Sequence, residues 1–198
     1  MADKPKIIIA VACQDTMKSK TCLSLVTALR NVPFDYDMIM RQGCDLIGAR
    51  VGLVRMALEM KGTHILFLDH DMFLNPVGNP ITQKMESPIL RLLNADKDII
   101  GAPYNFRSLP PKSTATPVSD LSDKKGLYRC EALGTGFLLI KLSVFDKIEK
   151  PWFNFGRNAD AELVYGEDTW FCRQAIKAGF EVWADGSLNI QHLGEYAY

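Results

Sequence analysis

The sequence lacks the two glycine-rich patterns with which many α/β proteins hold phosphate groups. Neither GxGxxG nor GxxxxGK[ST] occurs in its 198 residues, and the first apolar run leads instead into CQDTMKSK. Because these patterns bring backbone N–H groups against a diphosphate, their absence argues against a dinucleotide-dependent oxidoreductase and against a P-loop NTPase.

Charge excess, paired cysteines and long apolar runs are missing as well. Lys+Arg and Asp+Glu balance at 23 each, so we do not expect nucleic acid as a partner. The five cysteines form no CxxC pair, which is typical of reduced thiols in a cytoplasmic protein. No apolar run approaches the roughly 20 residues of a membrane span, and the N-terminal run is too short for a signal peptide. We therefore expect a soluble cytoplasmic protein without a membrane span.

Apolar periodicity predicts strands that alternate with helices along the chain. We expect strands at 6–13, 34–40, 64–69, 98–104, 127–133, 134–142, 181–186 and 188–194. Helices are expected at 19–29, 47–61, 84–94, 142–148 and 166–180. The alternation predicts an α/β domain with a mainly parallel sheet, and the length suits a single domain.

Details of three helix boundaries follow from the same pattern. Ser19 is a plausible N-cap of the first helix, and Gly62 and Gly179 would end the second and the last. The first helix would bury one apolar face, formed by Cys22, Leu25, Val26 and Leu29.

Residues 107–126 interrupt this alternation. The segment, RSLPPKSTATPVSDLSDKKG, is rich in Pro, Ser, Thr and Lys and has almost nothing to bury. It predicts a mobile loop inside the domain, either a plain insertion or a lid or acceptor loop, since loops of this length in compact domains are often functional.

The strand at 64–69 ends in two aspartates within THILFLDHDMFLNP. If the strand continues, Asp69 and Asp71 share a face roughly 6–7 Å apart and His70 points away. Neighbouring carboxylates repel unless a cation compensates, and open α/β sheets bind ligands at the carboxyl ends of their strands. A divalent metal that holds a diphosphate would explain the pair. The alternative is that the aspartates simply begin a turn.

Two later features supply further polar groups. The GED segment, residues 166–168, opens a helix, where carboxylates also complement the helix dipole and where a lowered carboxyl pKa is expected. His192, in QHLG, is a candidate third metal ligand, which suits Mn²⁺ better than Mg²⁺, or a core histidine.

Taken in order, the chain has an opening strand, the helical segment GARVGLVR, the DxD strand, GTGFLLI, GED at a helix start and a late histidine. This set resembles the GT-A glycosyltransferases from about Lys6 to Gly194, above all small family-2-like inverting enzymes of bacterial or viral (phage) type. The resemblance implies one Rossmann-like GT-A domain over 1–198, with helices on both sheet faces. A nucleotide-binding half to about residue 104 would precede the 107–126 loop and an acceptor-side half, 127–198.

The resemblance also implies an activity. The protein would move a sugar from a nucleoside-diphosphate sugar, with a UDP-sugar as the expected donor, to an acceptor hydroxyl with inversion. The acceptor would be a glycan, a lipid or another hydroxyl compound, and the cofactor would be Mn²⁺ or Mg²⁺.

Residue roles follow from the same resemblance. Asp69 would contact the ribose or the metal, Asp71 would ligate the metal directly, and His192 would be a further ligand. Asp168 would be the general base, and Glu167 would hold hydroxyls of acceptor or donor. The remaining nucleotide-sugar-binding candidates are Asp15, Arg50, His70, Tyr104, Gly134, Thr135 and Gly136.

Several of these positions have a purely structural alternative. Arg50 could be a solvated or salt-bridged surface residue, and the GTG segment could serve a β-bulge. The strand period also favours a structural role for His70 and for His64. An aromatic core is favoured over an acceptor platform for Trp152, Phe153 and Phe155.

Two other functional classes stay open. A nucleotidyltransferase or a phosphohydrolase would use the same metal for another reaction, and a sugar-nucleotide-binding module would use it without catalysis. Release of UDP with inversion at the anomeric carbon would indicate transfer, whereas pyrophosphate or sugar phosphate would indicate the first alternative.

Overall fold

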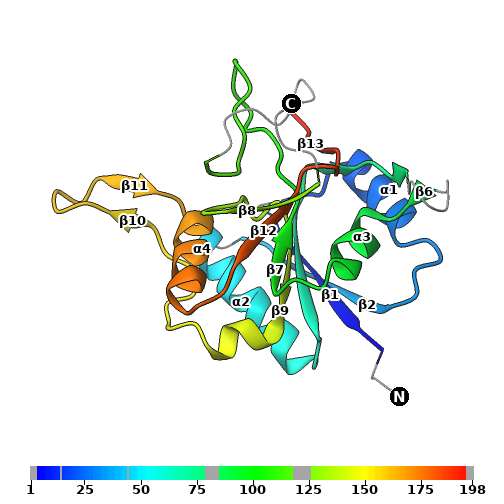
Figure 1. Ribbon diagram of the computed structural model, residues 1–198, viewed down its shortest axis with the longest axis horizontal. Coiled ribbons are helices and arrows are strands. Elements are labelled where there is room, and N and C mark those ends of the chain that lie inside the picture. Colours follow the sequence, from blue (N-terminus) through cyan, green and yellow to red (C-terminus); the bar gives the residue numbers. More distant parts are fainter. Residues whose placement is uncertain (1–3, 14, 44, 79–84, 118–125, 195–198) are drawn as a thin grey trace.

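A seven-stranded sheet in the order β2-β1-β3-β9-β7-β12-β8 forms the centre of the computed structural model, which describes residues 4–13, 15–43, 45–78, 85–117 and 126–194 (Figure 1). Its strands are β1 (Lys6–Ala12), β2 (Asp35–Arg41), β3 (His64–Asp69), β7 (Ile99–Gly101), β8 (Leu127–Cys130), β9 (Phe137–Lys141) and β12 (Val182–Asp185). Five of them run in one direction, while β8 and β9 run against their neighbours. The predicted mainly parallel α/β sheet is confirmed.

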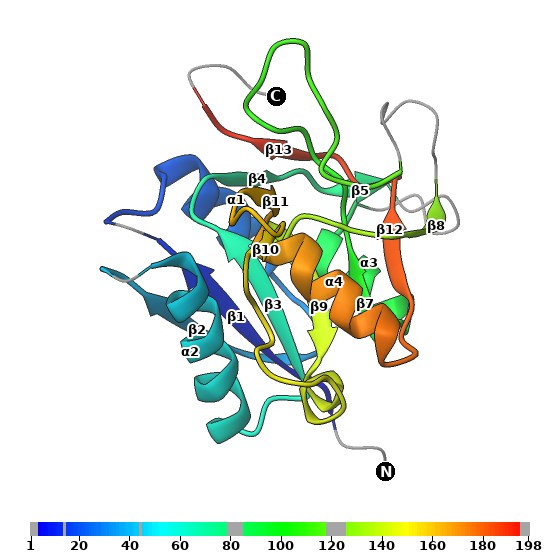
Figure 2. The same ribbon diagram turned by 90° about the vertical axis from the view of Figure 1, so that its left-hand side faces the viewer.

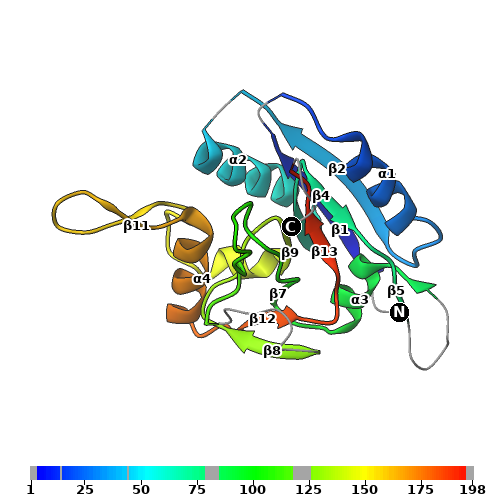
Figure 3. The same cartoon turned by 90° about the horizontal axis from the view of Figure 1, so that it is seen from above.

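Helices cover both faces of this sheet, as predicted (Figures 2 and 3). One face packs against α1 (Ser19–Ala28) and α3 (Pro88–Asn94), and the other against α2 (Leu46–Glu59), α4 (Glu167–Lys177) and the 3-10 helix η2 (Leu142–Asp146). In β1, Ile8 lies in the α2/α4 core and Ile7 and Ile9 lie in the α1/α3 core. Burial on both faces explains why β1 is a continuous apolar run and does not alternate.

The first helix buries a different face from the predicted one. Ser19 is its first helical residue and is exposed, and the N-cap position makes no side-chain hydrogen bond. Cys22 and Val26 are exposed, and the buried residues are Thr21, Ser24, Leu25 and Ala28. The Ser24 hydroxyl accepts a hydrogen bond of 3.2 Å from the backbone N–H of Leu74 in β4 (Met72–Leu74). Small residues let α1 approach β4 closely. Apolar periodicity in the sequence does not reveal such a contact, because the residues that make it are small and polar.

Two helix ends illustrate different uses of glycine. Gly179 has φ +90° directly after α4, as predicted for a helix stop. After α2, however, Lys61 takes the left-handed conformation, with φ 54°. Gly62 is required by packing instead, because a Cβ there would lie 2.6 Å from Cγ1 of Ile8.

A small second layer lies above the carboxyl end of β3 (Figure 2). There β4 pairs antiparallel with β13 (Ile190–His192), and His192 lies opposite Met72. The segment 105–117 crosses nearby and is joined by bridges between Asn105 and Ser113 and between Thr116 and Ala132. Residues 118–125 of the predicted mobile loop lie outside the described residues.

The remaining strands form two hairpins, β5 (Val77–Gly78) with β6 (Met85–Glu86) and β10 (Gly156–Arg157) with β11 (Leu163–Tyr165). The predicted elements at 98–104, 134–142 and 142–148 are shorter than expected, at Ile99–Gly101, Phe137–Lys141 and Leu142–Asp146. Within the described ranges, none of the helices combines the length and the apolar character needed to cross a bilayer.

Candidate functional site

A cleft of about 280 Å³ opens where β1, β3 and the first turn of α2 meet. Cys13, Asp45, Arg50, Asp69 and His70 are among its lining residues. Asp45 caps α2 by accepting a hydrogen bond of 2.8 Å from the Gly48 N–H. The cleft therefore combines the carboxyl ends of two parallel strands with a helix N-terminus, both of which commonly bind anionic ligands.

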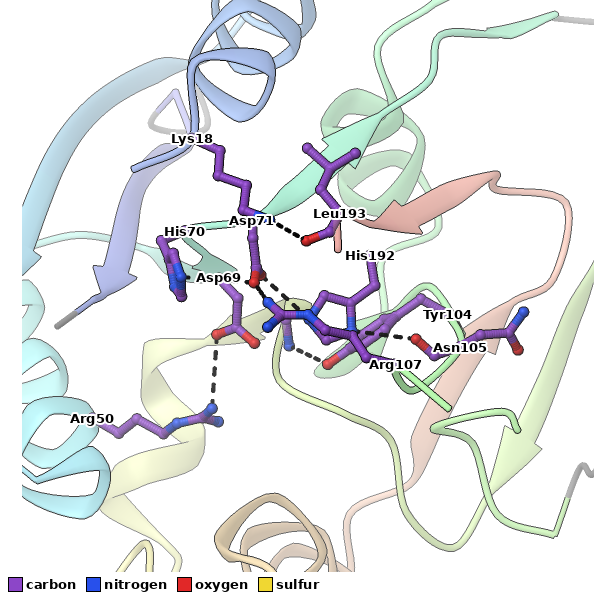
Figure 4. A network of polar contacts seen from close by, with 11 residues as sticks. Lys18, Arg50, Asp69, His70, Asp71, Tyr104, Asn105, Arg107, His192 and Leu193 are labelled. Carbon is purple, nitrogen blue, oxygen red and sulfur yellow. Dashed lines mark hydrogen bonds and ion pairs between the residues drawn. The ribbon is translucent and has the colours of Figure 1, made fainter. Parts of the chain in front are cut away.

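The DxD segment bends between its two aspartates. β3 ends at Asp69, and the chain turns at His70 and Asp71 into β4. The prediction that the two carboxylates share a strand face is therefore wrong. Asp69 Oδ1 faces Arg50 at 3.8 Å, whereas Asp71 is 1% exposed and faces His192 (Figure 4). His70 does not point away, because its Nε2 lies 3.7 Å from Asp71 Oδ2. The alternative prediction, a turn that begins at these aspartates, is thus correct for the local geometry.

A ring nitrogen of His192 and a carboxylate oxygen of Asp71 face each other. Nε2 of His192 lies 3.4 Å from Asp71 Oδ1, and Nδ1 lies 3.3 Å from the Asn105 carbonyl. Because a carbonyl only accepts, Nδ1 carries the proton of the neutral ring and Nε2 offers its lone pair to Asp71. Burial, followed by the charge of Arg107, lowers the pKa of His192, which favours this neutral form. A lone pair that faces a carboxylate oxygen is an arrangement that a shared cation would stabilise.

Asp71 is surrounded by cationic and ionisable groups. Its buried Oδ2 has no hydrogen-bond partner among the described residues, yet the guanidinium of Arg107 forms an ion pair with it. Among the residues that the structure describes, no group of three or more His, Cys, Asp or Glu side chains lies together in a way that could hold a metal ion. Asp71 and His192 would supply two ligands, and phosphate oxygens would complete the oxygen-rich set that Mg²⁺ and Mn²⁺ take. Asp71 and His192 therefore suit a divalent cation whose other ligands are oxygens of a bound diphosphate.

Arg50 links the DxD strand to α4. It is 4% exposed, and its Nη2 lies 3.2 Å from Glu167 Oε1 and 3.8 Å from Asp69 Oδ1. Its guanidinium also lies over the Phe67 ring, 5.9 Å from the centroid. Nε and Nη1 have no hydrogen-bond partner within the described ranges. The surface alternative for Arg50 is therefore wrong, and the residue is one of those that line the cleft.

The two carboxylates that open α4 have different surroundings. Glu167 is 7% exposed and paired with Arg50. Burial raises the pKa of Glu167, although the nearby Arg50 charge lowers it. Asp168 is half-buried, and its Oδ1 accepts a hydrogen bond of 2.6 Å from the Thr169 N–H.

Tyr104 lies beneath the site and fills the space beside two glycines. Its hydroxyl accepts a hydrogen bond of 2.9 Å from the Gly136 N–H, and its ring meets His192 edge-on with centroids 5.6 Å apart. A Cβ on Gly134 or on Gly136 would lie 2.5 or 2.6 Å from the hydroxyl oxygen. Thr135 between them is 1% exposed. The space beside Gly134 and Gly136, two of the candidate sugar-binding residues, is thus filled by the side chain of Tyr104.

Other predicted positions lie apart from this centre. Asp15 is exposed and is not among the residues that line the cleft; its backbone carbonyl accepts a hydrogen bond from Gln42 Nε2. Trp152 and Phe153 are buried in the α2/α4 core, as the core interpretation expected, and Phe155 is half-buried.

Sequence reasoning missed several residues that border Asp71. Arg107 opens the segment 107–126, which was predicted as a plain insertion or as a lid or acceptor loop without any residue being singled out, and Asn105 lies just before that segment. Lys18, on the first loop, donates a hydrogen bond of 2.5 Å from Nζ to the Leu193 carbonyl. The only available signal was a basic side chain just after a strand end, which is too common to single out a site.

Comparison with known proteins identifies the fold. No protein-family profile and no curated protein matches the sequence. The structure of A197 from STIV is similar over 96% of this chain and 86% of that chain, with 19% identity and a TM-score of 0.65. GalNAc-T7, solved with UDP, GalNAc and Mn²⁺, is similar over 98% of this chain but only 45% of its own, with 11% identity and a TM-score of 0.60. The chain has the mixed α/β architecture of a Rossmann-like GT-A domain.

Proposed function

We propose that the protein is a metal-dependent glycosyltransferase that moves a sugar from a nucleoside-diphosphate sugar, with UDP as the expected nucleotide, to an acceptor hydroxyl with inversion. The observation that carries the proposal is the proximity of two potential metal ligands, His192 Nε2 and Asp71 Oδ1, which lie 3.4 Å apart just beyond the carboxyl end of β3. The fold comparison supports it, because GalNAc-T7 was solved with UDP, GalNAc and Mn²⁺.

Asp71 and His192 would hold the cation in this proposal. Asn105 fixes the ring of His192 through Nδ1, as outer partners of metal-binding histidines commonly do. A divalent cation bound there would neutralise the charge that develops on the departing diphosphate.

The cleft beside Asp69 would receive the nucleotide. Its volume of about 280 Å³ suits part of a nucleotide-sized ligand. Arg50 offers Nε and Nη1, two buried donors without a described partner, and such donors are costly unless a ligand oxygen satisfies them. His70 and Asp69 line the same cleft and are placed to contact the ribose or the phosphates.

The base in this scheme is Asp168. Glu167 is held by Arg50, which leaves Asp168 as the carboxylate of the α4 terminus that is free of a described ion pair. It would accept the proton of the acceptor hydroxyl as the new bond forms, when that proton becomes acidic. Glu167 would act through Arg50, by fixing the guanidinium at the cleft.

Calorimetry with Mn²⁺ and UDP tests the proposal. Wild-type protein should bind UDP with Mn²⁺ present and much more weakly without it, and D71N should lose this dependence. D146N removes an exposed carboxylate of η2 and should bind like wild type. Failure of UDP to bind with Mn²⁺ would refute the proposal.

The reaction itself is tested by product analysis with UDP-sugars. Free UDP and an inverted anomeric centre would support transfer, whereas pyrophosphate or sugar phosphate would identify a nucleotidyltransferase or a phosphohydrolase. D168N should lose turnover and keep Mn²⁺-dependent UDP binding. If D168N still turns over, Asp168 is not the base.

A further inference from the structure

The guanidinium of Arg107 lies beside Asp71, where a bound metal would supply positive charge. This guanidinium forms an ion pair with Asp71 Oδ2 (Figure 4). The arginine side chain is 43% exposed, whereas the aspartate is 1% exposed. A divalent cation on Asp71 would therefore meet a like charge at contact distance, and the two cations compete for one carboxylate.

The backbone that carries Arg107 also positions a proposed metal ligand. Asn105, two residues earlier, holds Nδ1 of His192 through its carbonyl. Hydrogen bonds of 2.8 Å anchor the segment, from Phe106 N–H to the Lys112 carbonyl and from Thr114 N–H to the Tyr104 carbonyl. The anchored backbone lies at the site while the long arginine side chain, partly in solvent, is free to change its partner.

We propose that Arg107 is an exchangeable internal cation, which neutralises Asp71 while the site is empty and moves to the diphosphate when a divalent cation takes Asp71. This inference rests on the proposed function. The guanidinium suits both partners, because its planar fork pairs with carboxylate and with phosphate. Binding of the metal and binding of the nucleotide would then be coupled. The metal would neutralise Asp71 when Arg107 leaves it, and the diphosphate would give Arg107 a new partner.

The exchange predicts effects of opposite sign in one variant. R107Q removes the competitor, so Mn²⁺ alone should bind about tenfold more tightly, as expected if the arginine occupies Asp71 about nine-tenths of the time. The same variant also removes a charged donor to the diphosphate. At saturating Mn²⁺, UDP should therefore bind roughly tenfold more weakly. A merely structural arginine would change both affinities in the same direction or neither.

The experiment measures Mn²⁺ binding by electron paramagnetic resonance and UDP binding by calorimetry, for wild type, R107Q and K112Q. Lys112 lies on the same loop, so K112Q makes the same charge change away from Asp71 and should change neither affinity appreciably. Circular dichroism verifies that each variant is folded, and D71N in the R107Q background should abolish the tighter Mn²⁺ binding.

The outcomes separate this inference from the proposed function. Equal Mn²⁺ affinity of wild type and R107Q, abolished in both by D71N, would overturn the exchange and leave the metal site standing. Weaker binding of both Mn²⁺ and UDP to R107Q would also overturn it. Absence of Mn²⁺ binding in wild type and R107Q alike would overturn the exchange together with the proposed metal-dependent function.

Discussion

Replacing Arg50 by methionine should destabilise the protein, because the change leaves a buried carboxylate without its counter-ion. Glu167 Oε1 and Asp69 Oδ1 lie 3.2 and 3.8 Å from the guanidinium. With an effective dielectric constant near 20, each attraction amounts to about 4 to 5 kcal/mol, and the desolvation of the guanidinium offsets much of it. The net loss should be about 3 kcal/mol, within the usual range for removing one partner of a buried ion pair.

The second half of this prediction concerns Glu167. In R50M the carboxylate remains buried, so E167Q added to R50M should restore about 1 to 2 kcal/mol of the free energy of unfolding. Burial already raises the pKa of Glu167 above its ordinary value. A raised folded-state pKa gives a stabilising contribution that is present below the unfolded pKa, about 4.3, and lost as pH rises through the folded pKa. The deficit of R50M should therefore shrink when the pH is lowered from 7 towards 4.5.

Urea unfolding followed by tryptophan fluorescence measures these differences. R55M is the matched control, since Arg55 is an exposed arginine of the same helix and its loss should cost under about 0.5 kcal/mol. A cost below about 1 kcal/mol for R50M, or no recovery on adding E167Q, would show that Arg50 is solvated and that the ion-pair reasoning is wrong.

Three further predictions concern the scaffold. S24A should cost about 1 to 3 kcal/mol in urea unfolding because it leaves a buried N–H of β4 unpaired; S19A, at the uncapped start of α1, should change little. G136A should cost about 1 to 3 kcal/mol, since its Cβ would lie 2.6 Å from the Tyr104 hydroxyl; an unchanged thermal midpoint would contradict this packing. Burial lowers the pKa of His64 and of the other two histidines, so stability should fall as pH drops below about 6.5; H64Q should flatten that fall, and an unaltered pH profile would contradict it.

The elements that were predicted well are those whose partners follow from the chain itself. β1 and β3 are runs of β-branched and apolar residues, and α4 combines an apolar face with carboxylates at its start and a glycine stop. Each signal is local, so the sequence contains it in full. The face of α1 was missed because Ser24 is buried by a contact with β4, fifty residues away.

The strand continuation predicted after β3 was wrong for a similar reason, and the turn given as its alternative is correct. Asp69 and Asp71 alternate as a strand would, but the chain bends at His70 because β4 pairs with β13, more than a hundred residues later. That distant pairing places His192 beside Asp71 and leaves Asp69 with Arg50. A sequence motif can identify residues of such a site. Which charged side chains pair there depends on which distant segments of the chain pack against the site.

The two aspartates of the DxD segment lie beside different arginines. Asp69 and Glu167 share Arg50, which is nearly fully buried. Asp71 is paired with Arg107, whose side chain is partly in solvent. One guanidinium is thus held in the interior, whereas the other reaches into solvent. If the proposed exchange is correct, the buried charge would help to position the nucleotide, and the partly exposed one would leave Asp71 when a metal binds.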